Sequence, residues 1–134
     1  MNIDEIFKNT VKKSYQAKRT YDVRITLNKD GKGGYAIRFG FLNKAVEVIG
    51  GKPYAQVSSV CKCRNRIYFR FFDKKKYVDI YKISRPRDGK SMYIQFSVSD
   101  KEEKIYRSDW IQGTFKMQYD EACQLYYIAK GAAE

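Results

Sequence analysis

The sequence predicts an α+β fold, in which an N-terminal helix is followed by two tandem β-β-α-β-β repeats that form a pseudo-two-fold antiparallel-sheet domain. Three observations predict this fold. The apolar residues have helical spacing up to about residue 20 and a period of two afterwards, glycine-rich turns separate the alternating runs, and residues 28–39 (NKDGKGGYAIRF) are nearly repeated at 85–96 (RPRDGKSMYIQF). The 134 residues are 43% hydrophobic and 16% aromatic, which is enough to bury one core.

Residues 1–20 are predicted to form an amphipathic helix. Apolar residues lie on one face and lysines on the other, namely Ile3, Ile6, Phe7 and Val11 against Lys8, Lys12 and Lys13. Asn2 and Glu5 have the spacing of a capping box at its start. We expect this helix to cover one side of a sheet. The alternative is a basic helix that lies on a phosphate backbone or a membrane surface.

Residues 21–73 are expected to be the first, basic repeat. Alternating apolar residues in 21–28 (YDVRITLN) and 35–41 (YAIRFGF) predict two strands, and the KDGKGG between them supplies the glycines that a tight hairpin needs. Helical spacing over 42–49 precedes a Gly-Gly stop. A second pair of strands is expected at 54–61 and 66–72.

Residues 74–134 are expected to be the second, less basic repeat. At a shift of 58 residues, RDGK at 87–90 falls on KDGK at 29–32, and a capping box of Ser99 and Glu102 opens the second helix. Trp110 is expected to begin a strand and to lie in the core. Because a four-strand unit of about 50 residues has little core of its own, we expect the two repeats to form one compact unit.

The charge is strongly positive and uneven. The chain has 27 lysines and arginines against 15 acidic residues, a net charge of +12, and the excess lies in residues 1–98. Such a field attracts polyanions, of which nucleic acid is the commonest in a cytosol. No leader-like segment, membrane span or disulfide framework is recognisable, so we expect a cytoplasmic protein with reduced cysteines.

Basic and aromatic residues at outward strand positions are the candidate nucleic-acid contacts. If Val23, Ile37 and Phe69 point inward, their neighbours along each strand point outward. Guanidinium groups bind phosphates and an exposed tyrosine stacks on a base. Basic residues at the next turn and at the start of the second repeat extend the same prediction. The candidates are Arg24, Arg38, Lys62, Arg64, Arg66, Tyr68, Arg70, Lys74, Lys75 and Lys76.

Catalysis is not expected. The chain has no histidine, which excludes the common Ser-His and Cys-His nucleophilic sites and the usual zinc catalysis. The GKGG at 31–34 lacks the Gly-Lys-Ser/Thr ending of a P-loop. Cys61 and Cys63 have only Cys123 to join them, so one chain cannot build a four-cysteine metal site. We therefore expect no enzyme, no cofactor and no metal.

One run of the first repeat resembles a known family. Residues 33–57 (GGYAIRFGFLNKAVEVIGGKPYAQV), followed by NRIYFRF at 65–71, are similar to the AbrB/MazE type of swapped-hairpin domain. A tandem copy is similar in plan to the MraZ arrangement. The resemblance covers about 45 residues in each half. It implies DNA binding by basic residues on a two-fold sheet surface.

The sequence alone is compatible with two functions. The first is a non-enzymatic protein that binds DNA or RNA through an Arg/Tyr-rich sheet face of the first repeat, with a homodimer possible. The second is a small phage- or mobile-element-encoded inhibitor, of the anti-CRISPR or anti-restriction kind, that binds a nucleic-acid-handling protein complex. Binding to a membrane surface through the lysines of residues 8–13 and 74–76 is a third option.

Overall fold

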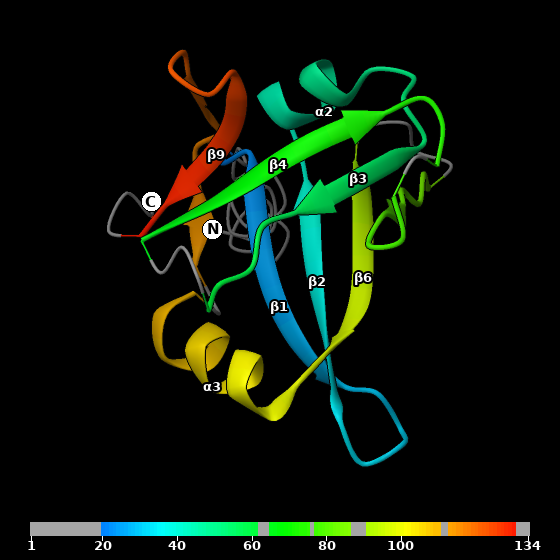
Figure 1. Cartoon of the computed structure of the whole chain (residues 1–134), viewed down its shortest axis with the longest axis vertical. Coiled ribbons are helices and arrows are strands. Elements are labelled where there is room, and N and C mark those ends of the chain that lie inside the picture. Colours follow the sequence, from blue (N-terminus) through cyan, green and yellow to red (C-terminus); the bar gives the residue numbers. More distant parts are fainter. Residues whose placement is uncertain (1–19, 62–64, 76, 87–90, 111–112, 131–134) are drawn as a thin grey trace, which may run out of the picture.

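The computed structural model describes residues 20–61, 65–75, 77–86, 91–110 and 113–130, which form two antiparallel sheets and two helices (Figure 1). The predicted N-terminal helix lies outside the described residues. The helices are α2 (Lys44–Ile49) and α3 (Asp100–Asp109). The strands are β1 (Val23–Lys29), β2 (Tyr35–Phe41), β3 (Tyr54–Val57), β4 (Arg66–Phe72), β5 (Tyr81–Lys82), β6 (Met92–Val98), β7 (Thr114–Phe115), β8 (Gln118–Asp120) and β9 (Leu125–Ala129). Within the described ranges, neither helix has the length and apolar character needed to cross a membrane.

Sheet A has the strand order β6-β2-β1-β7. The predicted hairpin is confirmed, because β1 and β2 pair antiparallel along their whole length, from Val23 with Phe41 to Lys29 with Tyr35. In its turn, the Asp30 carboxylate accepts hydrogen bonds from the backbone N–H groups of Lys32 and Gly34, at 2.8 and 3.1 Å. These bonds lower the pKa of Asp30.

Sheet B has the strand order β5-β3-β4-β9-β8. Strand β4 is its long central strand and matches the predicted range 66–72. Strand β3 is shorter than the predicted 54–61 and ends at Val57. The next pair keeps only one backbone bond, from the N–H of Ser58 to the carbonyl of Tyr68 at 3.0 Å, because the N–H of Tyr68 donates to the Ser58 hydroxyl at 2.9 Å instead of to its carbonyl.

The two sheets pack face to face over one aromatic core. Strands β3 and β4 cross β1, β2 and β6 obliquely, while α2 and α3 lie at opposite ends of the molecule (Figure 1). The ring of Phe39 from sheet A lies edge-on to Phe69 from sheet B at 5.7 Å, and it meets Tyr106 of α3 at 6.0 Å. All three side chains are buried. Inward residues of both sheets therefore share one hydrophobic cluster.

Helix α3 begins as the sequence predicts and extends to Asp109, next to Trp110. The Ser99–Glu102 capping box is confirmed. Trp110 is buried, as expected, but the prediction that it begins a strand is wrong, since it follows the last turn of α3 and its N–H donates to the carbonyl of Tyr106. The helix continues to this point because Tyr106 and Trp110, four residues apart, bury the same face. The strand begins only at Thr114.

A buried aspartate joins three parts of the fold. Asp22 is 4% exposed. Its two carboxylate oxygens accept the backbone N–H of Lys44, the first residue of α2, at 3.0 Å and that of Met117 at 2.8 Å. Its own N–H donates to the carbonyl of Phe115. Asp22 therefore connects β1 with α2 and with the segment that follows β7.

Candidate nucleic-acid interface

The predicted basic face is divided between the two sheets. Arg24 and Arg38 lie on sheet A, and Tyr68 and Arg70 lie on sheet B. Each points outward on its own strand, as predicted, because its strand neighbours are buried in the core. The prediction that they form one face is wrong. The hairpins β1–β2 and β3–β4 belong to sheets packed face to face, so their outward residues point away from each other.

The other candidates that the structure describes, Arg66, Lys74 and Lys75, lie at the two ends of β4. Arg66 opens the strand, and Lys74 and Lys75 are exposed just beyond its last residue, Phe72. Lys62, Arg64 and Lys76 lie outside the described residues. Five of the ten predicted contacts therefore lie on β4 or just beyond its end.

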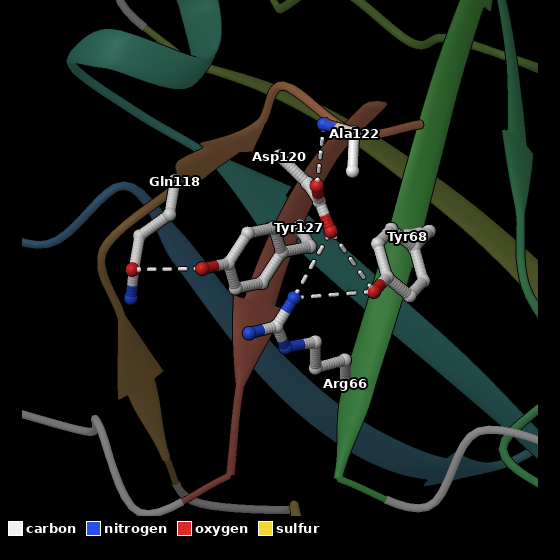
Figure 2. Close-up of polar contacts among 6 residues, drawn as sticks. All are labelled: Arg66, Tyr68, Gln118, Asp120, Ala122 and Tyr127. Atoms are coloured by element: carbon white, nitrogen blue, oxygen red, sulfur yellow. Dashed lines mark hydrogen bonds and ion pairs between the residues drawn. The ribbon is translucent and has the colours of Figure 1, made fainter. Parts of the chain in front are cut away.

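Arg66 is held in place by side chains from three strands (Figure 2). One guanidinium nitrogen donates to the Asp120 carboxylate at 3.1 Å and to the Tyr68 hydroxyl at 3.2 Å. The guanidinium carbon lies 4.1 Å from the centre of the Tyr127 ring, and the Tyr127 hydroxyl donates to Gln118 at 3.1 Å. The arginine is therefore held in one orientation, with the geometry of a cation–π contact.

Asp120 carries a negative charge at the centre of this cluster. Partial burial on its own would raise the pKa of Asp120, but hydrogen bonds from Ala122 and Cys123, together with the charge of Arg66, outweigh it and lower the pKa. Its carboxylate offsets the charge of Arg66. The net positive charge at this end of β4 is consequently smaller than Arg66 alone would give.

Arg70 forms a second arginine–aromatic cluster farther along β4. Two of its guanidinium nitrogens donate to the Gln56 side-chain oxygen, at 3.0 and 2.7 Å. The guanidinium carbon lies 5.1 Å from the ring centres of both Phe72 and Tyr77. Arg70 is exposed, and Tyr77 is 44% exposed. This cluster presents an ordered cation and an accessible ring on the same surface.

A cavity lies beside the end of β4, where outward residues such as Arg70 meet inward ones such as Phe69 and Phe71. Its volume is about 300 Å³. Lys52 and Arg70 supply its charge, Phe72 and Tyr126 are among its aromatic walls, and none of its lining residues is acidic. We name the whole surface the sheet B face. It consists of Lys52, Tyr54, Gln56, Arg66, Tyr68, Arg70, Phe72, Tyr77, Asp120 and Tyr127.

The outer face of sheet A carries an arginine with contacts like those of Arg70. Arg38 donates to the side-chain oxygen of Gln95 at 2.9 Å, and its guanidinium carbon lies 4.2 Å from the centre of the Tyr93 ring. Arg24 is exposed. Among the described residues, neither arginine forms an ion pair.

Of the residues of the sheet B face, the sequence prediction contained only Arg66, Tyr68 and Arg70. Tyr127 and Asp120 come from β9 and β8, more than fifty residues after Arg66, and only the pairing of β4 with β9 brings them to Arg66. Tyr77 lies five residues after the end of β4, and its place in an aromatic-rich basic stretch was the one available signal. Within the described ranges, no group of three or more Cys, Asp or Glu side chains could hold a metal ion.

Comparison of the chain with protein-family models, with curated proteins and with solved structures found no match.

Proposed function

We propose that the chain is a non-enzymatic nucleic-acid-binding protein that takes single-stranded DNA or RNA on the sheet B face. The observation that carries the proposal is the repeated contact of an arginine with aromatic rings on one outer surface, at Arg66 with Tyr127 and at Arg70 with Tyr77. A base of any type can stack on an aromatic ring, and guanidinium groups beside the ring can contact the phosphates. The net charge of +12 draws a polyanion to the surface.

A single strand suits this surface better than a duplex. Bases in a duplex are stacked on each other, so rings such as Tyr77 have no free base face to contact. A single strand can place a base against Tyr77 and a second one in the cavity lined by Phe72, with its phosphates near Lys52, Arg70 and Lys74. The inhibitor alternative remains, because a protein that imitates or covers a nucleic-acid channel can use the same exposed side chains.

Fluorescence anisotropy tests the proposal. Labelled single-stranded DNA, single-stranded RNA and duplex DNA are titrated at about 50 to 200 mM salt. We expect tighter binding of a single strand, a steep loss of affinity with salt, and a loss of about 5-fold or more in Tyr77→Ala, as removal of a stacking ring typically costs. Arg70→Ala is expected to weaken binding and reduce the salt slope by about 0.7.

The matched control is Arg107→Ala. Arg107 is an exposed arginine of α3 that pairs with Glu103, so the substitution changes the net charge equally at a distance from sheet B. Equal losses in Arg70→Ala and Arg107→Ala would show that only net charge matters. Weak binding that neither variant changes would refute direct nucleic-acid binding, and a pull-down for a protein target would then test the inhibitor alternative.

We also infer that the chain consists of two copies of one β-β-α-β-β unit that exchange strands, as the resemblance to swapped-hairpin domains implies. Two pairings support this. Strand β1 of the first half pairs with β7 of the second, and β3 of the first half pairs with β5 of the second. Residues 1–73 and 74–134, produced as separate chains, are expected to fold only when mixed, as measured by circular dichroism and size-exclusion chromatography. A lone half that folds as a monomer would contradict strand exchange.

A further inference from the structure

A glycine in the middle of sheet A has no structural explanation. Gly40 lies in β2, between its register partners Arg24 of β1 and Tyr93 of β6. Its backbone is outside the left-handed region, and a Cβ atom added there would meet only the carbonyl oxygen of Arg24, at an ordinary 3.8 Å. Glycine weakens a strand interior and often marks a place where a ligand approaches the backbone. Here neither conformation nor crowding requires it.

The missing side chain leaves a hollow, which we name the Gly40 depression. Its volume is about 190 Å³. Its floor is Gly40, and its walls include Arg24, Arg38, Tyr21 and Tyr93. None of the lining residues is acidic. The depression therefore combines two positive charges, two phenol rings and an accessible stretch of backbone.

The two arginines are arranged for an anion. Arg24 is opposite Gly40, and Arg38 is two residues before Gly40 on the same strand, so the arginines are diagonal neighbours, about 7–8 Å apart at the backbone and somewhat closer at their Cβ atoms. Arg38 is held by Gln95 and by the ring of Tyr93, while Arg24 is exposed. Two like charges at this separation repel, and a bound phosphate between them removes that cost and accepts hydrogen bonds from both guanidinium groups.

The size and the walls restrict the ligand further. A volume of about 190 Å³ lies below the 300 Å³ or so at which pockets for drug-sized molecules begin, so it suits one phosphorylated unit. A flat glycine floor beside Tyr21 and Tyr93 favours a planar ring attached to that phosphate. We propose that the Gly40 depression is a binding site for a nucleoside phosphate, with the phosphate between Arg24 and Arg38 and the base against the tyrosines.

Such a group has two sources, a free nucleotide and the 5′-phosphorylated end of a nucleic-acid chain. The site lies on the opposite surface from the sheet B face, so it does not depend on the function proposed there. Isothermal titration calorimetry with 5′-AMP, adenosine and inorganic phosphate tests the site itself. Oligonucleotides with and without a 5′-phosphate, compared with 5′-AMP, distinguish the two sources.

The decisive variant is Gly40→Val, which fills the floor without changing the charge. Valine favours strands and its Cβ has room, so the fold should persist, and the fluorescence of buried Trp110 checks this. Ser97→Val, an exposed position on β6 outside the lining, is the matched control. Arg24→Ala is a second variant at an exposed side chain.

We expect 5′-AMP to bind at least ten-fold more tightly than adenosine and than inorganic phosphate. Gly40→Val and Arg24→Ala are each expected to weaken 5′-AMP binding about ten-fold, and Ser97→Val to leave it unchanged. Equal binding of 5′-AMP by the wild type and both variants would overturn the proposal, as would binding of inorganic phosphate as tight as that of 5′-AMP. Arg70→Ala should leave 5′-AMP binding unchanged, so this site and the sheet B face can fail separately.

Discussion

Replacement of Asp22 by alanine is expected to destabilise the protein more than any other removal of a single charge from the described part of the chain. Asp22 is buried, and its carboxylate is the acceptor for the N–H groups of Lys44 and Met117. Alanine removes both acceptors. The start of α2 and the segment after β7 then lose the group that joins them to β1.

The magnitude follows from these two bonds. A hydrogen bond to a charged group contributes about 1.5–3 kcal/mol, so two contribute about 3–6 kcal/mol. Water can reach the N–H of Lys44, which lies in an exposed residue, whereas the bond from Met117 is buried and its N–H would remain unsatisfied. We therefore expect Asp22→Ala to lower the free energy of unfolding by about 3–5 kcal/mol, a large part of the roughly 5–15 kcal/mol that a domain has.

Urea unfolding measures this loss. The only tryptophan, Trp110, is buried and reports the transition by fluorescence, with circular dichroism as a second probe. The control is Asp73→Ala, the same substitution at an exposed position, which should change the stability by less than about 0.5 kcal/mol. A loss below about 1 kcal/mol in Asp22→Ala, with an unchanged m-value, would refute the assignment of Asp22 as a link between these elements.

Three further predictions concern alkaline stability, binding and packing. Burial raises the pKa of the Tyr106 phenol, so above pH 10 the unfolded chain releases a proton that the folded chain keeps. Stability should therefore fall with rising pH by up to about 1.4 kcal/mol per unit, and Tyr106→Phe should make that slope shallower in urea titrations between about pH 10 and 11; an equal slope in both proteins would contradict this origin. Asp120→Asn should strengthen single-strand binding in the anisotropy assay, because the charge of Arg66 is then no longer offset by a carboxylate. The gain should exceed that of Glu121→Gln, which removes an exposed negative charge in the same turn. Equal gains would show that only the net charge matters. Phe39→Ala should lower the free energy of unfolding by about 3–5 kcal/mol in the same urea assay, because Phe39 packs between both sheets and α3. Val78→Ala, at a side chain that is 99% exposed, should have little effect. Similar losses at the two positions would rule out Phe39 as a core residue.

The local elements were predictable from the sequence where the signals are local. The ranges 35–41 and 66–72 match β2 and β4, the KDGKGG turn forms the β1–β2 hairpin, and Ser99 with Glu102 caps α3. In each case residues only a few positions apart carry the information, through strand alternation, glycine conformations or a capping hydrogen bond.

The partners of each strand were not predictable in the same way. Nothing near residues 66–70 indicates that β4 pairs with β9, and that pairing brings Tyr127 to Arg66 and, through β8, Asp120 as well. Likewise, nothing in the alternating run 35–41 distinguishes Gly40, whose position between Arg24 and Tyr93 depends on the pairing of β2 with β1 and β6. The Arg66 cluster and the Gly40 depression therefore depend on contacts between distant segments.

The sequence by itself determined that Arg24, Arg38, Tyr68 and Arg70 point out of their strands, because side chains alternate between the two faces of any strand that buries one of them. Only the tertiary structure decided that these residues form two surfaces. The hairpins that carry them enter different sheets, and the packing of Phe39 against Phe69 turns the outer faces of those sheets in opposite directions. Alternation is a property of one strand, whereas the choice of sheet depends on how the apolar faces of the whole chain are buried together.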